Sequence, residues 1–114
     1  MKAALITTDG TITSTDYTSL KTMQMAIGGY LQMTGSQFGW TAYVDEEGLM
    51  KQLEHNPVAS EILGKQVVGP AIVFAGVDDE GHEIGLTDEQ LSQLLVRQAR
   101  RSVIDYFQHN RRAE

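Results

Sequence analysis

Residues 39–63, GWTAYVDEEGLMKQLEHNPVASEIL, decide the fold, because this one run combines a strand pattern, a turn and the start of a helix. From Trp40 to Asp45 the residues alternate in the period-two pattern of a strand with one buried face. Residues 46–48, Glu-Glu-Gly, supply a turn, since glycine adopts a positive φ at little cost. The stretch therefore predicts a strand that ends at an acidic corner.

Three independent signals predict a short helix over residues 57–63. Asn56 is a favoured N-cap residue, and Pro57 then takes the first helical position, where its missing N–H costs nothing. Gly64 is placed to end the helix in the left-handed conformation.

The chain before this stretch predicts a hairpin and a longer helix. Asp9-Gly10 lies between the β-prone runs 3–8 and 11–13 and is a strong hairpin signal. An apolar stripe then predicts a helix over residues 19–33. Gly28-Gly29 interrupts the stripe, so the helix either ends there or allows another backbone to approach closely. We expect it to continue.

After residue 63, the most apolar run of the chain, QVVGPAIVFAG at 66–76, predicts a buried strand. Pro70 cannot donate to a ladder, so it marks an edge, a bulge or the start of the strand. A turn at 78–81 and a short strand at 82–84 follow. Thr87 and Gln90 then form a capping box, which begins a helix predicted to run to residue 109. The apolar face of this helix consists of Leu91, Leu94, Leu95, Ala99, Val103, Tyr106 and Phe107.

These elements predict the α+β class: a small, mostly antiparallel sheet with two principal helices packed on one face and one short helix. At 114 residues, 41% of them hydrophobic, the chain is expected to form a single domain over residues 1–114. Residues 97–114 are expected to be a basic helical extension of that domain.

The charge of the chain is divided unevenly. Residues 1–96 hold 13 acidic residues against four lysines, whereas residues 97–114 hold five arginines against two acidic residues. An acidic body repels phosphates, which argues against duplex nucleic acid as a partner. No apolar run is long enough to span a membrane, and the lack of cysteine removes disulfides and thiolate metal sites. We therefore expect a cytoplasmic protein.

The catalytic and metal-ligating residue types lack a recognised arrangement. Residues 45–47 and 78–80 are acidic clusters, but both precede a glycine at a predicted turn and neither has EF-hand spacing. His55, His82 and His109 lie in separate elements without ligand spacing. We expect no catalytic residue, no bound metal and no cofactor. A metal-assisted hydrolase that uses the acidic corners stays an alternative.

One constellation predicts a binding surface. Tyr30, Trp40, Tyr43 and Asn56 converge if the first helix packs on the sheet that holds the two central aromatics. Aromatic rings with one amide suit the stacking and edge recognition of a nucleotide-like or other planar ligand. The alternative is a mixed aromatic core in which Asn56 only caps a helix.

Three segments carry a family resemblance: IGGYLQ at 27–32, AYVDEEGLMKQLEHNPVAS at 42–60 and VVGPAIVFAGVDDEGHEIGLTDE at 67–89. With them the chain resembles the domain-of-unknown-function family 3846, small proteins of actinobacteria and of their phages and plasmids. The residues that match the family pattern are Gly28, Gly29, Tyr30, Asp45, Glu46, Gly48, Asn56, Ala59, Ser60, Gly69 and Pro70. The resemblance implies a phage or mobile-element context and brings no assigned activity.

We expect a non-enzymatic accessory protein of a phage or mobile element that binds a host protein or a small ligand. We also expect a homodimer, because the C-terminal helix is longer than the body needs and is basic where the body is acidic. Its partner-binding residues would be Arg97, Arg100, Arg101, Arg111 and Arg112. The alternative is that the helix folds back on its own core and its arginines keep the end soluble.

Overall fold

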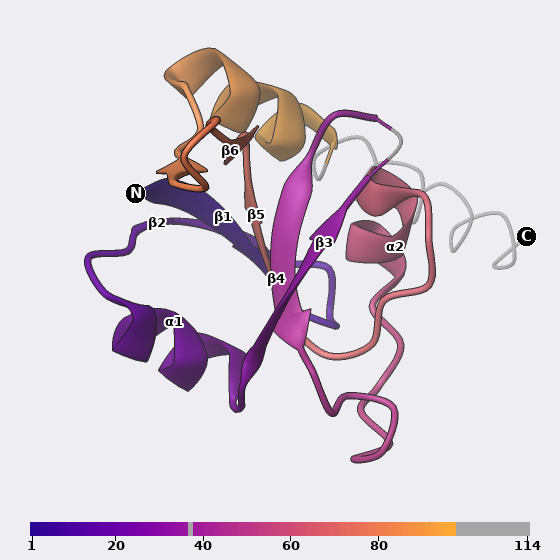
Figure 1. The fold of residues 1–114 in the computed structure, drawn as a ribbon. Coiled ribbons are helices and arrows are strands. Elements are labelled where there is room, and N and C mark those ends of the chain that lie inside the picture. The colour runs from indigo at the N-terminus through magenta and orange to yellow at the C-terminus, as the bar shows by residue number, and fades with distance from the viewer. Residues whose placement is uncertain (37, 98–114) are drawn as a thin grey trace, which may run out of the picture.

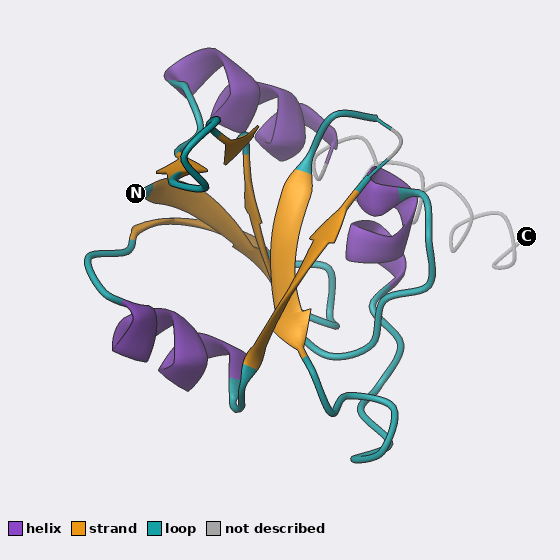
Figure 2. Ribbon diagram, in the orientation of Figure 1, coloured by secondary structure: helices purple, strands orange, loops and turns teal. Residues whose placement is uncertain are grey.

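The chain folds as a five-stranded sheet with helices on both faces, shown as a computed structural model in Figures 1 and 2. The structure describes residues 1–36 and 38–97. In chain order the elements are β1 Lys2–Ile6, β2 Ile12–Asp16, α1 Leu20–Ile27, β3 Leu31–Gly35, β4 Thr41–Asp45, α2 Pro57–Leu63, β5 Ala71–Phe74, β6 Gly76–Val77 and β7 Glu83–Ile84. A further helix covers residues 88–97. The predicted α+β class is confirmed.

The strands of the sheet follow the order β2-β1-β5-β4-β3, and all neighbours run antiparallel. β5 lies in the middle, and all four of its residues are buried. Pro70 directly precedes this strand, as its missing N–H predicts. β6 and β7 form a separate two-stranded ribbon. The most apolar run of the sequence is therefore the centre of the fold.

Two hydrophobic clusters lie on opposite faces of the sheet. Ala42 and Val73, paired across β4 and β5, belong to the cluster that α2 and the helix over 88–97 cover. Tyr43 and Ile72, the next pair, belong to the cluster that α1 covers. Figure 1 shows α1 and α2 on opposite sides of the sheet. The two principal helices, α1 and the helix over 88–97, thus lie on opposite faces of the sheet, and the prediction that both pack on one face is wrong. Side chains alternate between faces and β5 is apolar on both, so each face needs a helix.

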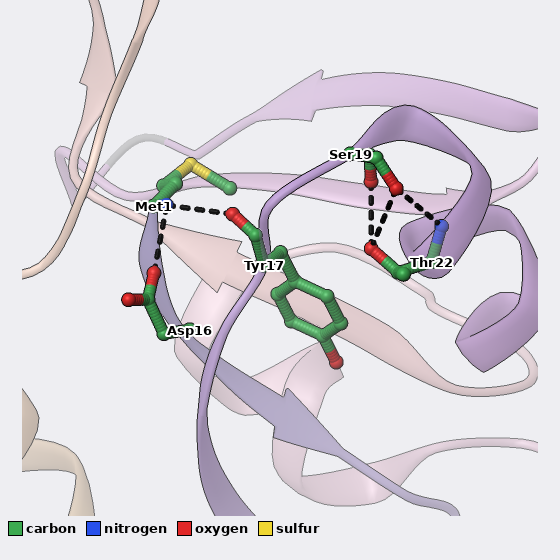
Figure 3. Close-up of polar contacts among 5 residues, drawn as sticks. All are labelled: Met1, Asp16, Tyr17, Ser19 and Thr22. Atoms are coloured by element: carbon green, nitrogen blue, oxygen red, sulfur yellow. Dashed lines mark hydrogen bonds and ion pairs between the residues drawn. The ribbon is translucent and has the colours of Figure 1, made fainter.

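The chain opens with the predicted hairpin of β1 and β2 and passes into α1 through a hydrogen-bonded connection (Figure 3). The amino group of Met1 donates to Asp16 Oδ1 at 2.9 Å and to the carbonyl oxygen of Tyr17 at 2.7 Å. Ser19 then caps α1, its Oγ accepting from the N–H of Thr22 at 3.2 Å. The first two bonds tie the end of β2 to the N-terminus, and the third closes the first turn of α1.

α1 is shorter than the predicted helix over 19–33. It ends because Gly28 has a φ of 86° and its N–H donates to the carbonyl oxygen of Gln24 at 2.8 Å. Residues 31–33, which the apolar stripe assigned to the helix, belong to β3 instead. Leu31 packs on the cluster that α1 covers, so its apolar character fits either structure and periodicity did not separate them.

The predicted starts of the other two helices are also confirmed. Asn56 Oδ1 accepts from the N–H of Ala59 at 3.1 Å to cap α2, and Gly64 ends that helix with a φ of 71°. Thr87 and Gln90 form the two reciprocal bonds of a capping box, at 2.9 and 3.1 Å.

The helix over residues 88–97 packs through Leu94, which is fully buried, and through the partly buried Leu91. Leu95, assigned to the same face from the sequence, is exposed. The rest of the predicted helix, with Ala99, Val103, Tyr106 and Phe107, lies outside the described residues. Within residues 1–36 and 38–97, no helix is long and apolar enough to cross a membrane.

Candidate functional site

The four residues predicted to form a ligand surface do not come together. Trp40 packs on the α2 side of the sheet and Tyr43 on the α1 side. Tyr30 directly precedes β3 and is 66% exposed, whereas Asn56 is completely buried. Residues an odd number of positions apart along an extended chain point to opposite faces, which separates Trp40 from Tyr43.

Asn56 uses its whole side chain inside the protein. Its Nδ2 donates to the carbonyl oxygens of Ile6 at 3.0 Å and Gly69 at 2.9 Å, while Oδ1 accepts from Ala59. These bonds join the end of β1, the segment before β5 and the first turn of α2. A buried amide with three internal bonds has a structural role, so the capping interpretation accounts for Asn56.

Asp45 is also committed to internal contacts. Its side chain is 2% exposed; Oδ2 accepts from Lys51 Nζ and Oδ1 from the N–H of Glu47, each at 2.8 Å. Burial alone would raise the pKa of Asp45, but the bonds from Lys51 and Glu47 and the charge of Lys51 outweigh burial and hold the pKa below its usual value. A Cβ on Gly29 would lie 2.6 Å from Lys51 Nζ and 2.8 Å from Asp45 Oδ2, so a side chain there would displace this ion pair.

Two more glycines of the family pattern are fixed by packing. A Cβ on Gly48 would lie 3.0 Å from Val68 Cγ2, and one on Gly69 would lie 2.7 Å from Leu53 Cδ1. Gly69 also has a φ of 74°, which other residues rarely adopt. We use the name buried corner for Gly29, Asp45, Gly48, Lys51, Asn56 and Gly69. The family motifs therefore hold the chain in shape here.

A groove of about 290 Å³ opens beside the buried corner, and we call it the β3 groove. It lies between the α2 side of β3 and β4, the turn after β4 and the segment 65–68. Three valines form an apolar floor and four polar side chains form the rim. The floor is Val44, Val67 and Val68; the rim is Gln32, Glu46, Lys65 and Gln66. Leu49 and Met50 extend the groove with side chains that are 75% and 81% exposed.

The rim holds one cation, one carboxylate and two amides. Lys65 Nζ donates to Thr34 Oγ1 at 2.8 Å and has no carboxylate partner among the described residues. The exposed side chains of Gln32, Glu46 and Gln66 make no hydrogen bond with the described part of the chain. This arrangement can bind a polar ligand.

Sequence reasoning missed the β3 groove. It assigned Gln32 to a helix and Gln66 to the apolar strand, and it gave Lys65 no role. The available signal was a pair of polar residues between Gly64 and an apolar run. Only the sheet topology brings that pair opposite β3.

The second acidic cluster closes its own turn. Asp78 Oδ1 accepts from the N–H groups of Glu80 and His82, both at 2.9 Å. No three His, Cys, Asp or Glu side chains within residues 1–36 and 38–97 are grouped to hold a metal ion. The described residues thus provide no ligand set for the metal-assisted hydrolase alternative.

Arg97 is the one predicted partner-binding arginine that the structure describes. Its Nη1 lies 3.8 Å from Glu61 Oε1 of the same chain, and both side chains are exposed. Arg100, Arg101, Arg111 and Arg112 lie outside the described residues, so the basic extension and its role in a dimer stay predictions.

Comparison with known proteins agrees with the resemblance drawn from the motifs. Residues 1–99 match the family described as Domain of unknown function (DUF3846). No curated protein and no solved structure matches the chain. The matched residues include the buried corner and the β3 groove. Since the match spans most of the 114 residues, the chain belongs to the DUF3846 family.

Proposed function

We propose that this chain is a non-enzymatic binding protein whose ligand occupies the β3 groove. It acts as an accessory protein of a phage or mobile element in the cytoplasm of a host cell. The family resemblance supports that context, and the cysteine-free sequence accords with a reducing compartment. The observation that carries the proposal is the groove itself, an apolar floor beneath polar side chains that have few partners within the described chain.

The chemistry of the rim defines the ligand. Lys65 would contact an anionic group and Glu46 a cationic or hydrogen-bond-donating group, while Gln32 and Gln66 can both donate and accept. None of the described residues that line the groove is aromatic, which makes a stacked base a poorer fit. An amino-acid-like compound or a peptide segment of a host protein fits best, with a nucleotide-like ligand as the alternative.

A thermal-unfolding screen tests this proposal. The panel contains amino acids, short peptides and nucleoside phosphates, because a ligand present at 100 times its Kd stabilises a protein by about 2.7 kcal/mol. We expect an amino-acid-like or peptide compound to raise the Tm of the wild type. The variants Lys65→Met and Gln32→Leu should each lose that rise.

Lys21→Met is the matched control. It removes the same charge, but Lys21 lines a separate shallow hollow along α1 with Met25 and Tyr30. The control should keep the ligand-induced rise in Tm. If Lys21→Met abolishes the ligand-induced rise in Tm and Lys65→Met preserves it, the ligand binds in the hollow along α1 and the proposal is contradicted. A response to nucleoside phosphates alone would favour the alternative ligand.

A further inference from the structure

β3 is an open edge of the sheet. It pairs with β4 on one side, and no described strand pairs with its other side. The bonds from Glu46 N–H to Tyr30 O and from Ser36 N–H to Trp40 O place the even-numbered residues in the hydrogen-bonded pairs with β4. Such pairs alternate in an antiparallel ladder, so the N–H and C=O groups of the odd-numbered residues 31, 33 and 35 point away from β4. A row of backbone donors and acceptors is therefore available for another strand.

The sequence of β3 does nothing to protect this edge. Proteins usually shield an edge strand with charged side chains, a proline or a bulge. β3 reads LQMTG, which has no charge and no proline, and its register with β4 is continuous. The opposite edge, β2, reads ITSTD, and its Asp16 forms an ion pair with the amino group of Met1. The two edges thus differ in how well they exclude a further strand.

Exposed apolar side chains gather on the segments around β3. Met33 lies within the strand, Tyr30 directly precedes it and Phe38 follows it in the turn to β4. Met25 shares a hollow with Tyr30, and Leu49 and Met50 share the β3 groove with residues of β3. A stable interface buries about 800 Å² on each partner, more than a five-residue strand supplies. These flanking side chains are the additional surface that such an interface needs.

We propose that β3 pairs antiparallel with β3 of a second copy of this chain, across a two-fold axis at Met33. The outward-pointing residues allow three pairs in this register: Met33 with Met33, and Leu31 with Gly35 twice. Any other register that uses the odd-numbered residues gives fewer pairs. Because the strand is uncharged, no like charges come to lie opposite each other. The two sheets join into one sheet of ten strands, by an isologous contact.

This pairing changes the β3 groove. In the proposed register, Gln32 of one copy lies opposite Thr34 of the other, on the face that lines the groove. A two-fold axis perpendicular to the sheet keeps both grooves on the same side, so each copy contributes Gln32 to the border of the other groove. The significance of this shared border rests on the proposed function, but the pairing of the strands does not.

Sedimentation equilibrium on the full chain tests the pairing. We expect a species of twice 12.6 kDa at micromolar concentration. Met33→Lys places two ammonium groups opposite each other and should raise the dissociation constant about 100-fold. Ser14→Lys is the matched control: it is an exposed, outward-pointing residue on β2, the other edge, and should leave the constant unchanged. Far-UV circular dichroism checks that both variants fold.

A cross-linking pair of variants gives an independent readout. The chain has no cysteine, so Met33→Cys introduces a single thiol. Residues paired by hydrogen bonds across an antiparallel ladder have Cα atoms about 5.5 Å apart, within the range of a disulfide. Mild oxidation should link Met33→Cys chains into dimers and leave Ser14→Cys chains monomeric.

Three results overturn the pairing: a wild type that stays monomeric to about 100 μM, a dimer that Met33→Lys leaves intact, and Met33→Cys chains that cross-link no better than Ser14→Cys chains. The second result would place the dimer on another surface, such as the basic C-terminal segment. A ligand response lost in Lys65→Met but kept in a monomeric Met33→Lys variant would support the groove and separate its function from the pairing.

Discussion

The buried corner and the β3 groove are neighbours that share Asp45 and Gly48, yet their polar groups are used in opposite ways. In the corner, the amide of Asn56 and the carboxylate of Asp45 are hydrogen-bonded within the chain. In the groove, Gln32 and Gln66 make no bond with the described residues. The polar groups of the corner are therefore satisfied within the fold, whereas the two amides of the groove rim are left to contact a ligand.

This contrast shows where the family pattern has its effect. Most of the polar and glycine residues that identify the family lie in the corner, where they cap a helix, adopt a positive φ or fit beside an ion pair. A motif that draws attention in the sequence is thus evidence for the fold in this chain. Of the four rim residues of the β3 groove, only Glu46 is among the residues that match the family pattern.

The largest expected effect comes from Asn56→Ala. The substitution leaves the carbonyl oxygens of Ile6 and Gly69 and the N–H of Ala59 buried without their partners. Each orphaned group costs about 1–3 kcal/mol, so the free energy of unfolding should fall by about 3 kcal/mol or more. Urea denaturation followed by circular dichroism measures the change.

Ser60→Ala is a suitable comparison for that experiment, because Ser60 lies in the helix that Asn56 caps and, among the described residues, its hydroxyl bonds only to Val67. We expect it to cost about 1 kcal/mol. Equal losses for the two variants would contradict the central role given to Asn56.

Asp45→Asn should have the next largest effect. The variant loses the charged bond to Lys51, so we expect the free energy of unfolding to fall by about 1–2 kcal/mol at pH 7. The folded pKa of Asp45 is depressed, so its contribution is present above the unfolded pKa of about 3.9 and is lost as pH falls through the folded pKa. The difference between wild type and variant should therefore shrink below about pH 4. A difference that stays constant down to pH 2 would show that the charge of Asp45 does not contribute.

The helix caps could be predicted from the sequence because capping is local chemistry. Asn56 lies three residues before the N–H that it accepts from, and Thr87 lies three residues before Gln90, so both bonds connect neighbours in the chain. β3 could not be predicted in the same way. Leu31 is apolar in a helical stripe and equally apolar in an edge strand, and only Gly28 in its left-handed conformation decided between them.

The candidate site was harder to predict because it is non-local. The β3 groove joins Gln32, Glu46 and Lys65, which belong to three separate segments and carry no spacing that identifies them. The predicted aromatic surface failed for the converse reason. Trp40 and Tyr43 are close in the sequence, but side chains alternate along the extended chain that enters β4, so these two lie on opposite faces.

Substitutions in the β3 groove should barely change stability, in contrast to those in the buried corner. Gln66→Ala and Gln32→Leu remove exposed side chains without internal bonds, so each should change the free energy of unfolding by less than about 0.5 kcal/mol. The same urea titrations provide the measurement. A loss as large as that of Asp45→Asn would make the groove part of the fold and remove its distinction from the corner.

The last prediction concerns Tyr43, a buried residue whose hydroxyl donates to the exposed Glu83 at 3.1 Å. Burial, followed by the charge of Glu83 and this hydrogen bond, raises the pKa of Tyr43 to about 12. Because the folded pKa exceeds the unfolded value of about 10, the contribution to stability is present below pH 10 and is lost between pH 10 and about 12. Glu83→Gln removes the charge but leaves the burial, so the pKa should fall while staying above 10. Ultraviolet titration of the tyrosinate band, with Tyr43→Phe identifying the signal, measures it. An unchanged pKa in Glu83→Gln would mean that burial alone sets it and that Tyr43 belongs wholly to the interior.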